Sequence, residues 1–272
     1  MRDKVIKYVM ERHCRMGGFC FYRLEEPNGL DTCCALSVLK LLNIPFHDER
    51  TVSYLQAMQH EDGSYDNVFI SFYSLKSLLM MKERPAYDPW PYIQDHIQKD
   101  RVFADKLPVE VTSIFRKMKC LLDLYKIYQN KTDEFFESRL IRFILGFQND
   151  DGGFGYPRSS LGETSKALTM LRGLSSPPVD LQTSSFVRRC EIPNYGFTNM
   201  PGSSLSFMEY IHEGLLALRV LNYKPQYASH CIEFIKNCQN INGGFSRTTH
   251  TGIATLENTF YAVSALKFLS AL

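Results

Sequence analysis

The chain has 272 residues, of which 44% are hydrophobic and 22% are charged, a balance that excludes a disordered or collagen-like protein. Its 31 basic and 29 acidic residues leave a net charge of +2, which argues against a dedicated nucleic-acid-binding protein. No apolar run approaches the ~18 residues of a membrane span, and the N-terminus lacks the pattern of a secretory signal. We therefore expect a cytoplasmic protein without a membrane span, whose eight cysteines are reduced.

Two kinds of helical segment alternate along the chain. Segments with one apolar stripe are typical of outer helices that keep one wet face, whereas segments that are apolar nearly all round must be covered on most sides. The outer helices are predicted over residues 2–14, 49–59, 88–100, 133–147, 180–190 and 226–238, and the inner helices over 31–43, 67–81, 109–128, 162–174, 205–222 and 255–271. Most prolines fall between these segments, and no run alternates cleanly enough to predict a strand. The predicted class is all-α.

A motif of glycine and an aromatic residue separates each outer helix from the next inner helix. The strong copies, 148–154 and 239–245, share Gln, Gly-Gly and Phe at the same offsets. Weaker copies end at Phe19, Tyr65 and Phe197, and a degenerate copy is expected near Phe103. The glycines permit a tight turn, the ring can fill the gap between helix pairs, and the glutamine can bond free backbone groups. The copies recur about every 45 residues, so six repeats fill the chain.

The last predicted inner helix, 255–271, is apolar and does not resemble a polar cap. A stack of repeats exposes its apolar ends unless capping repeats cover them. Packing of the sixth repeat on the first would bury this helix. We therefore predict one domain over residues 1–272, built as a closed double ring of six inner and six outer helices.

The Gln-x-x-x-Gly-Gly-Phe motif resembles the repeat of the prenyltransferase and squalene-cyclase superfamily, and the pattern is closest to protein prenyltransferase β subunits. The resemblance covers essentially the whole chain and implies a closed α6–α6 toroid. It also implies an aromatic-lined central cavity that holds an isoprenoid chain. Since such β subunits work with an α subunit, an α-subunit-like protein partner is implied as well.

The resemblance also implies a zinc site. In protein prenyltransferases an Asp-x-Cys pair opens one inner helix, and a later histidine completes the site. Asp31-Thr32-Cys33 matches the pair, so Asp31 and Cys33 are the implied catalytic residues and zinc ligands, with His250 as the candidate third ligand. Zinc would lower the pKa of a substrate thiol, and the thiolate would attack the allylic carbon. The alternative is structural: Asp31 caps a helix, and Cys33 is a small core residue.

Cations for a diphosphate are expected at three positions. Arg158 and Arg247 follow the two strong motifs, and Lys166 lies early in the fourth inner helix, where a helix N-terminus adds to the attraction for an anion. The family places Arg and Lys shortly before the Asp-x-Cys pair, whereas this chain has only Arg23 there, together with two glutamates. The alternative is that the loop arginines are simply solvated.

Aromatic residues near the starts of the inner helices are expected to line the cavity, among them Tyr65, Tyr156, Tyr210 and Phe260. Such a surface suits an isoprenoid, whose burial stabilises the complex by roughly 25 cal/mol per Å². The alternative is a core that these side chains fill completely. The Asp-x-Asp-Asp motif of triterpene cyclases is absent, so cyclisation is disfavoured.

Two functions are compatible with the sequence, because a fold does not by itself define an activity. An enzyme would bind an isoprenoid diphosphate in the aromatic cavity and transfer the isoprenoid to an acceptor. A non-catalytic toroid would bind an isoprenoid, another apolar ligand or a protein partner. The Asp31-Thr32-Cys33 pair and the aromatic residues favour the enzyme, whereas the incomplete zinc set favours the binding protein.

Overall fold

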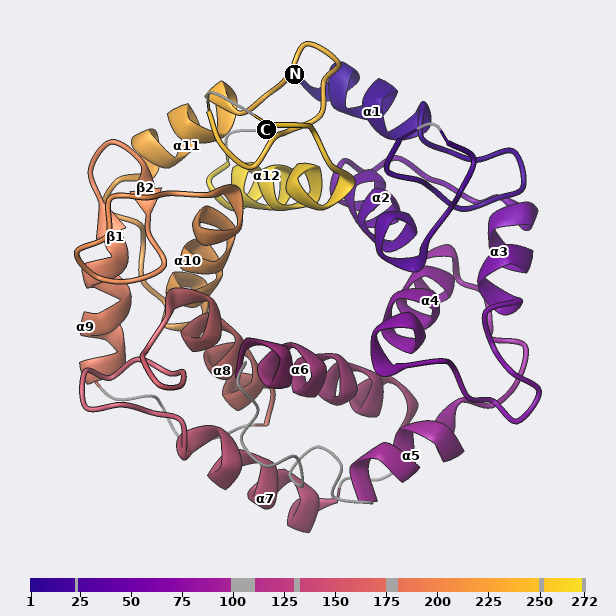
Figure 1. Ribbon diagram of the computed structural model, residues 1–272, viewed down its shortest axis with the longest axis horizontal. Coiled ribbons are helices and arrows are strands. Elements are labelled where there is room, and N and C mark those ends of the chain that lie inside the picture. Colours follow the sequence, from indigo (N-terminus) through magenta and orange to yellow (C-terminus); the bar gives the residue numbers. More distant parts are fainter. Residues whose placement is uncertain (23, 99–110, 130–132, 175–180, 250–251, 271–272) are drawn as a thin grey trace. The chain divides into compact units, whose positions relative to one another are not determined.

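The computed structural model describes residues 1–22, 24–98, 111–129, 133–174, 181–249 and 252–270 (Figure 1). The chain divides into two compact units: unit 1 comprises Met1–Tyr92 and Ile235–Leu272, and unit 2 comprises Ile93–Phe234. A single domain over residues 1–272 stays a prediction. None of the helices in the described ranges combines the length and apolar composition that a membrane span requires.

All twelve predicted helices are present. The predicted outer helices are the odd-numbered elements α1 (Arg2–Met10), α3 (Glu49–Gln56), α5 (Trp90–Gln98), α7 (Glu134–Leu145), α9 (Leu181–Cys190) and α11 (Ala228–Asn237). The predicted inner helices are the even-numbered elements α2 (Gly29–Leu41), α4 (Val68–Met81), α6 (Val111–Tyr128), α8 (Leu161–Gly173), α10 (Met208–Val220) and α12 (Leu256–Phe268). The first two outer helices end earlier than predicted, because the residues that follow already turn toward the motif.

The motifs form short hairpin turns. In three of them the first residue makes an antiparallel bridge with the residue six positions later: His13 with Phe19, Gln148 with Phe154, and Gln239 with Phe245. In the fifth repeat the turn lengthens into β1 (Glu191–Ile192) and β2 (Gly196–Phe197), where Glu191 pairs with Phe197. The sequence pattern missed these strands because two residues are too short to alternate. The degenerate copy near Phe103 lies outside the described residues.

In unit 1, α2 lies between α12 and α4, while α1 packs on α2 and α3 packs on α4 (Figure 1). The sixth motif packs on α1: a Cβ atom on Gly243 would lie 2.2 Å from the carbonyl oxygen of Lys4. The first motif packs on α3 in the same way, since a Cβ on Gly17 would lie 2.3 Å from the carbonyl oxygen of Arg50. The first and last repeats are therefore neighbours, which confirms the predicted packing of the sixth repeat on the first.

In unit 2, α8 lies between α6 and α10, and α9 packs on both α8 and α10 (Figure 1). The fourth motif packs on α9, where a Cβ atom on Gly152 would lie 2.3 Å from the carbonyl carbon of Gln182. Both units therefore follow one rule, by which a motif packs on the backbone of the next odd-numbered helix.

The motif aromatic residues anchor the even-numbered helices. Phe19, Phe154 and Phe245 are fully buried. Their backbone amides donate hydrogen bonds to threonines at the same place in the helix that follows: Thr32 at 2.9 Å, Thr164 at 2.9 Å and Thr259 at 3.1 Å. A buried amide without a partner costs about 1–3 kcal/mol. The threonines therefore tie each helix start to its hairpin turn.

Candidate functional site

Asp31 lies in the first turn of α2, which begins two residues earlier than predicted. The N-cap is Asn28, whose Oδ1 accepts a hydrogen bond from the Asp31 amide at 2.8 Å. In return, Asn28 Nδ2 donates to Asp31 Oδ2 at 2.5 Å. The suggested capping role of Asp31 was therefore wrong, because Asn28 has the extended backbone of a cap and Asp31 completes a reciprocal capping pair.

A buried polar cluster surrounds Asp31, with contributions from α12 and from the start of the chain. Burial raises the pKa of Asp31; the Asn28 hydrogen bond opposes this rise, the Glu257 carboxylate adds to it, and the Arg12 guanidinium opposes it. Arg12 lies 3.4 Å over the ring of Tyr8 and donates to the Tyr8 carbonyl at 2.8 Å. Burial also raises the pKa of Tyr8 to about 12. Burial in this cluster thus shifts the pKa of both acids upward.

Cys33 lies one half-turn farther along α2 and faces different neighbours. The side chain is buried, and burial raises the pKa of its thiol, while Lys76 of α4 and hydrogen bonds with Ser77 and Ser37 act in the opposite direction. Its partners therefore come from α4 and α2, whereas those of Asp31 come from α12 and the first repeat.

A zinc ion in a protein needs three or four converging ligands. Within the described ranges, no three His, Cys, Asp or Glu side chains lie close enough together to hold a metal ion. Asp31 and Cys33 have partners on different elements, and burial favours the neutral thiol over the thiolate that would bind zinc. His250 lies outside the described residues. The described donors by themselves do not fit a zinc ion, and the zinc site stays a prediction.

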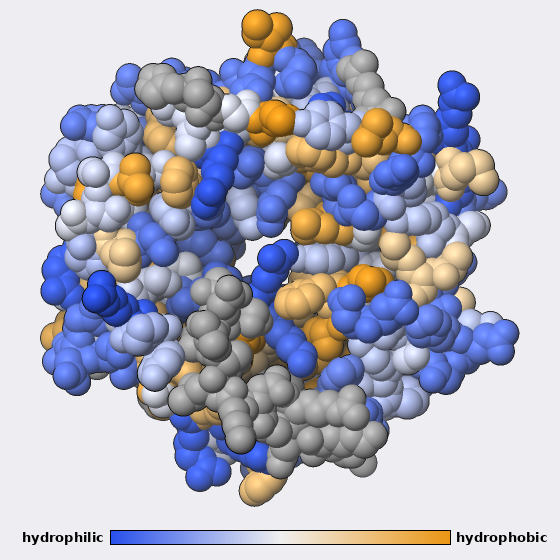
Figure 2. Space-filling view, in the orientation of Figure 1, coloured by the Kyte–Doolittle hydropathy of each residue, from blue (hydrophilic) through white to orange (hydrophobic). Residues whose placement is uncertain are grey.

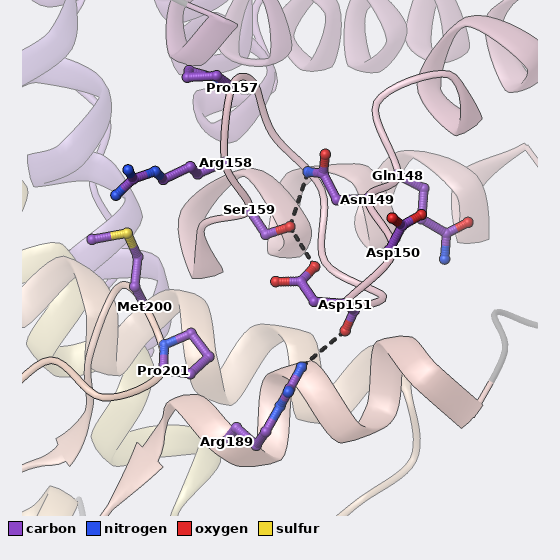
Figure 3. A pocket seen from close by; sticks show the side chains of 10 residues that line it. All are labelled: Gln148, Asn149, Asp150, Asp151, Pro157, Arg158, Ser159, Arg189, Met200 and Pro201. Atoms are coloured by element: carbon purple, nitrogen blue, oxygen red, sulfur yellow. Dashed lines mark hydrogen bonds between the residues drawn. The ribbon is translucent and has the colours of Figure 1, made fainter.

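Arg158 lines a cleft of about 550 Å³ beside the fourth motif (Figure 3). It is exposed and makes no hydrogen bond or ion pair with the described part of the chain. Figure 3 shows its side chain extending away from Asp151, on the side of Met200. Arg189 of α9 donates to the Asp151 carbonyl at 2.9 Å, and Asp151 Oδ1 accepts from Ser159 at 2.6 Å.

Charge in this cleft is balanced, because its lining includes two arginines and two aspartates, Asp150 and Asp151. A diphosphate would therefore meet Arg158 together with two anionic groups. Arg247 is exposed in the loop after Phe245. The role of both arginines in diphosphate binding stays a prediction.

Lys166 is engaged by two carboxylates in unit 2. Its Nζ donates to the Gly162 carbonyl at 2.9 Å and lies 3.6 Å from a carboxylate oxygen of Glu163 and 3.6 Å from one of Glu213. Glu163 is 5% exposed, and burial raises its pKa, while Lys166 lowers it and Glu213 raises it. The ammonium group thus already faces two carboxylates, and its role in binding an incoming anion stays a prediction.

Two of the four predicted cavity residues lie half-buried on even-numbered helices. Phe260 of α12 packs beside Tyr261 at 5.8 Å between ring centroids, and Tyr210 of α10 packs beside Phe207 at 5.3 Å. Each unit therefore carries aromatic side chains that are only partly covered.

The other two predicted cavity residues have different surroundings. Tyr65 is only 4% exposed and packs on Tyr92 at 6.2 Å between ring centroids, so it fills a gap between repeats and does not line a cavity. Tyr156 is 56% exposed in the loop that precedes α8. Tyr65 thus occupies the motif position that plugs the repeat, and its role in ligand binding stays a prediction.

Sequence reasoning missed the partnership of Glu213 with Lys166 and that of Glu257 with Asp31. The spacing of Glu163 and Lys166 within one helix turn was a usable signal for their ion pair. Glu213 and Glu257 come from later repeats, and their approach depends on how neighbouring helices are rotated. No spacing along the chain reveals such a contact.

The sequence matches the family model of the prenyltransferase alpha-alpha toroid domain over residues 1–161 and 182–272. The chain therefore belongs to this family, and the predicted all-α toroid class is confirmed. No curated protein matches the chain.

Several solved structures share the fold. Protein geranylgeranyltransferase-I from Candida albicans, complexed with GGPP, has a TM-score of 0.71 at 18% identity, over 98% of this chain and 91% of that one. A variant of the type II terpene cyclase MstE from Scytonema, in complex with geranylgeranyl dihydroxybenzoate, has a TM-score of 0.63 at 11% identity, over 99% and 96%. A protein from Actinoplanes has a TM-score of 0.61 at 14% identity, over 99% and 98%. At these identities the likeness concerns the fold alone.

Proposed function

We propose that this protein binds an isoprenoid diphosphate and places the isoprenoid chain against the half-buried aromatic side chains of its even-numbered helices. The observation that carries the proposal is the presence of these side chains, Phe260 and Tyr210 among them, on helices of a toroid-family chain. Two structural neighbours hold a geranylgeranyl compound. An isoprenoid offers only apolar surface and π bonds, for which aromatic faces are good partners.

Binding without chemistry is the form of the proposal that the site favours. Asp31 and Cys33 have partners on different elements, and the Cys33 thiol is held neutral by burial. Prenyl transfer is the second candidate, favoured by the Asp31-Thr32-Cys33 match. An α-subunit-like partner and a cytoplasmic location belong to this proposal; the eight free cysteines support the latter.

Thermal unfolding with geranylgeranyl diphosphate tests the proposal. A ligand present at 100 times its Kd raises the free energy of unfolding by about 2.7 kcal/mol. We expect Phe260→Ala and Tyr210→Ala to weaken this stabilisation, whereas Phe135→Ala, which alters a 74% exposed side chain on α7, should leave it unchanged. Absence of stabilisation in the unaltered protein would refute the proposed function.

The same measurement with added zinc separates the two candidates. Stabilisation that does not depend on zinc supports the binding protein. Stabilisation that requires zinc and disappears in Cys33→Ala supports the transferase. Direct zinc analysis of the purified protein gives a second, independent reading.

A further inference from the structure

A groove of about 710 Å³ opens between the C-terminal ends of α2 and α4 in unit 1. Both helices end in the same way: Asn43 and Lys82 adopt left-handed backbone conformations, and the amides of Ile44 and Glu83 return to the carbonyls of Leu39 and Leu78. This helix ending satisfies the carbonyls of Leu39 and Leu78 with backbone amides. The groove lies near the end of α2 that is remote from Asp31, so it is separate from the Asp31 cluster.

The floor of the groove is apolar. Leu79 is 50% exposed and Met80 is half-buried, while Leu36, Leu39 and Met81 form the buried base. Figure 2 shows hydrophobic side chains gathered over the part of the molecule that α2 and α4 occupy. A groove of this volume falls in the range of small-molecule pockets, about 300–1,000 Å³. It can therefore hold an apolar chain.

The rim of the groove is basic. Lys40 and Lys82 line it, and neither makes a hydrogen bond or ion pair with its side chain among the described residues. Two further cations, Arg2 and Lys267, bond the carbonyls that end α2, at 3.0 Å from Leu42 O and 2.6 Å from Leu41 O.

No carboxylate opposes these charges, because none is among the groove's described lining residues. The adjacent Glu83 is paired with His47 at 2.9 Å. An anionic group at the rim would therefore meet two available ammonium groups and no carboxylate among the described lining residues.

We propose that this groove binds an amphiphile with one anionic head group, a carboxylate or a phosphate. The head group lies between Lys40 and Lys82, and the alkyl or prenyl chain lies along Leu79 and Met80. A protein partner fits less well, since stable protein interfaces take about 20–30 residues on each side, whereas twelve described residues line the groove. The proposal goes beyond the proposed function, because it uses neither Phe260 nor Tyr210.

Methionine methyl groups provide a local test. The chain has ten methionines, of which Met80 and Met81 line the groove. In protein labelled with ¹³C at the methionine methyl groups, decyl phosphate added as a monomer should shift these two signals saturably, at one molecule per chain. The variants Met80→Leu and Met81→Leu assign the signals. The proposal would be overturned if the signal of Met80 or the signal of Met81 showed no saturable shift.

Charge variants test the rim. The double change Lys40→Gln and Lys82→Gln should weaken binding about tenfold or more, because charge-assisted contacts are roughly twice as strong as neutral ones. The matched control, Lys224→Gln with Lys236→Gln, removes two other exposed lysines and should leave the affinity unchanged. Equal affinity in both double variants, or equally tight binding of uncharged decanol, contradicts the proposal. Unchanged thermal unfolding verifies that the variants are folded.

Three further arms identify the source of the ligand. Decanoate in place of decyl phosphate distinguishes a carboxylate from a phosphate head group, and saturable binding of either supports the proposal. Phosphatidylserine vesicles that bind the protein when neither monomer does would identify a membrane surface and overturn it. Self-association that Leu79→Glu abolishes would identify a second copy of the chain as the occupant. That result would also overturn the proposal. Failure of isoprenoid binding at Phe260 affects none of these results.

Discussion

Single residues set how closely the repeats approach one another. Gly244 lies against Tyr8 of α1, and a Cβ atom on it would be 2.3 Å from the ring atom Cε2. Tyr8 is fully buried and held by the Arg12 guanidinium, so its ring cannot move aside easily. The absence of a side chain at this glycine is therefore a packing requirement at the contact between the last and first repeats.

We expect Gly244→Ala to lower the free energy of unfolding by about 1–3 kcal/mol, as overpacking of a filled core does. The matched control is Gly162→Ala in α8, where the nearest atom to a new Cβ would be the flexible Lys166 Nζ at 3.4 Å. Alanine there should be neutral or slightly stabilising, because glycine is a poor helix former. Urea unfolding measures both changes, and equal stability of the two variants would contradict the packing argument.

A second residue-scale prediction concerns the buried Glu163 carboxyl. Burial raises its pKa above the ordinary value of 4.5, so the folded chain holds this proton to a higher pH than the unfolded chain does. Stability therefore falls as pH rises through the interval between the two values. Glu163→Gln removes this fall and should be more stable than the unaltered protein at neutral pH.

The difference should shrink as the pH falls below 4.5, where both states of the unaltered protein become protonated. Thermal unfolding across this range provides the measurement, with the exposed Glu233→Gln as control. A difference that grows on acidification would show that the carboxylate stabilises the fold.

At the scale of secondary-structure elements, each well-formed repeat joins three parts: an odd-numbered helix, a hairpin turn and an even-numbered helix. The first position of the hairpin bonds the next odd-numbered helix by different chemistry in different repeats. Gln148 donates to Thr183 at 3.1 Å, while the Glu191 carboxylate accepts from the amides of Gln226 and Tyr227. In these two repeats the position therefore bonds the start of the next odd-numbered helix, although glutamine is replaced in one of them.

Thr164 connects the hairpin to α8, since the buried Phe154 amide donates to its hydroxyl. We expect Thr164→Val to cost about 1–3 kcal/mol of stability, because the amide loses its partner. Thr169→Val is the control on the same helix: its hydroxyl only donates to the Ser165 carbonyl, so little should change. Similar losses in the two variants would exclude the amide as the cause. Calorimetric unfolding provides both values.

At the scale of the whole molecule, the end of the chain completes its beginning. α12 covers one side of α2, and the motif before α12 packs on α1. Lys267 bonds the Leu41 carbonyl at 2.6 Å, which adds a polar link between residues 226 positions apart in sequence. The first repeat therefore lacks two of its packing partners, α12 and the motif before α12, until the last repeat has folded.

A chain that ends at Leu221, and so lacks α11 and α12, should lose cooperative unfolding and bind hydrophobic dyes. The reason is that the truncation uncovers the apolar surfaces of α1 and α2. The thermal unfolding and the dye fluorescence of the truncated chain are measured and compared with those of the full chain. A cooperative transition at an unchanged temperature would mean that the last repeat contributes little to the first.

The sequence by itself determined the helices, their order and the packing of the sixth repeat on the first. These features follow from apolar patterns and from Gly-Gly-Phe copies that recur about every 45 residues, so local and long-range preferences agree. Only the tertiary structure decided the surroundings of the candidate site residues: Asp31 meets Glu257, Cys33 faces Lys76, and Lys166 is engaged by Glu213. The physical reason is that these charges meet across neighbouring helices, whose rotation is set by the packing of whole faces.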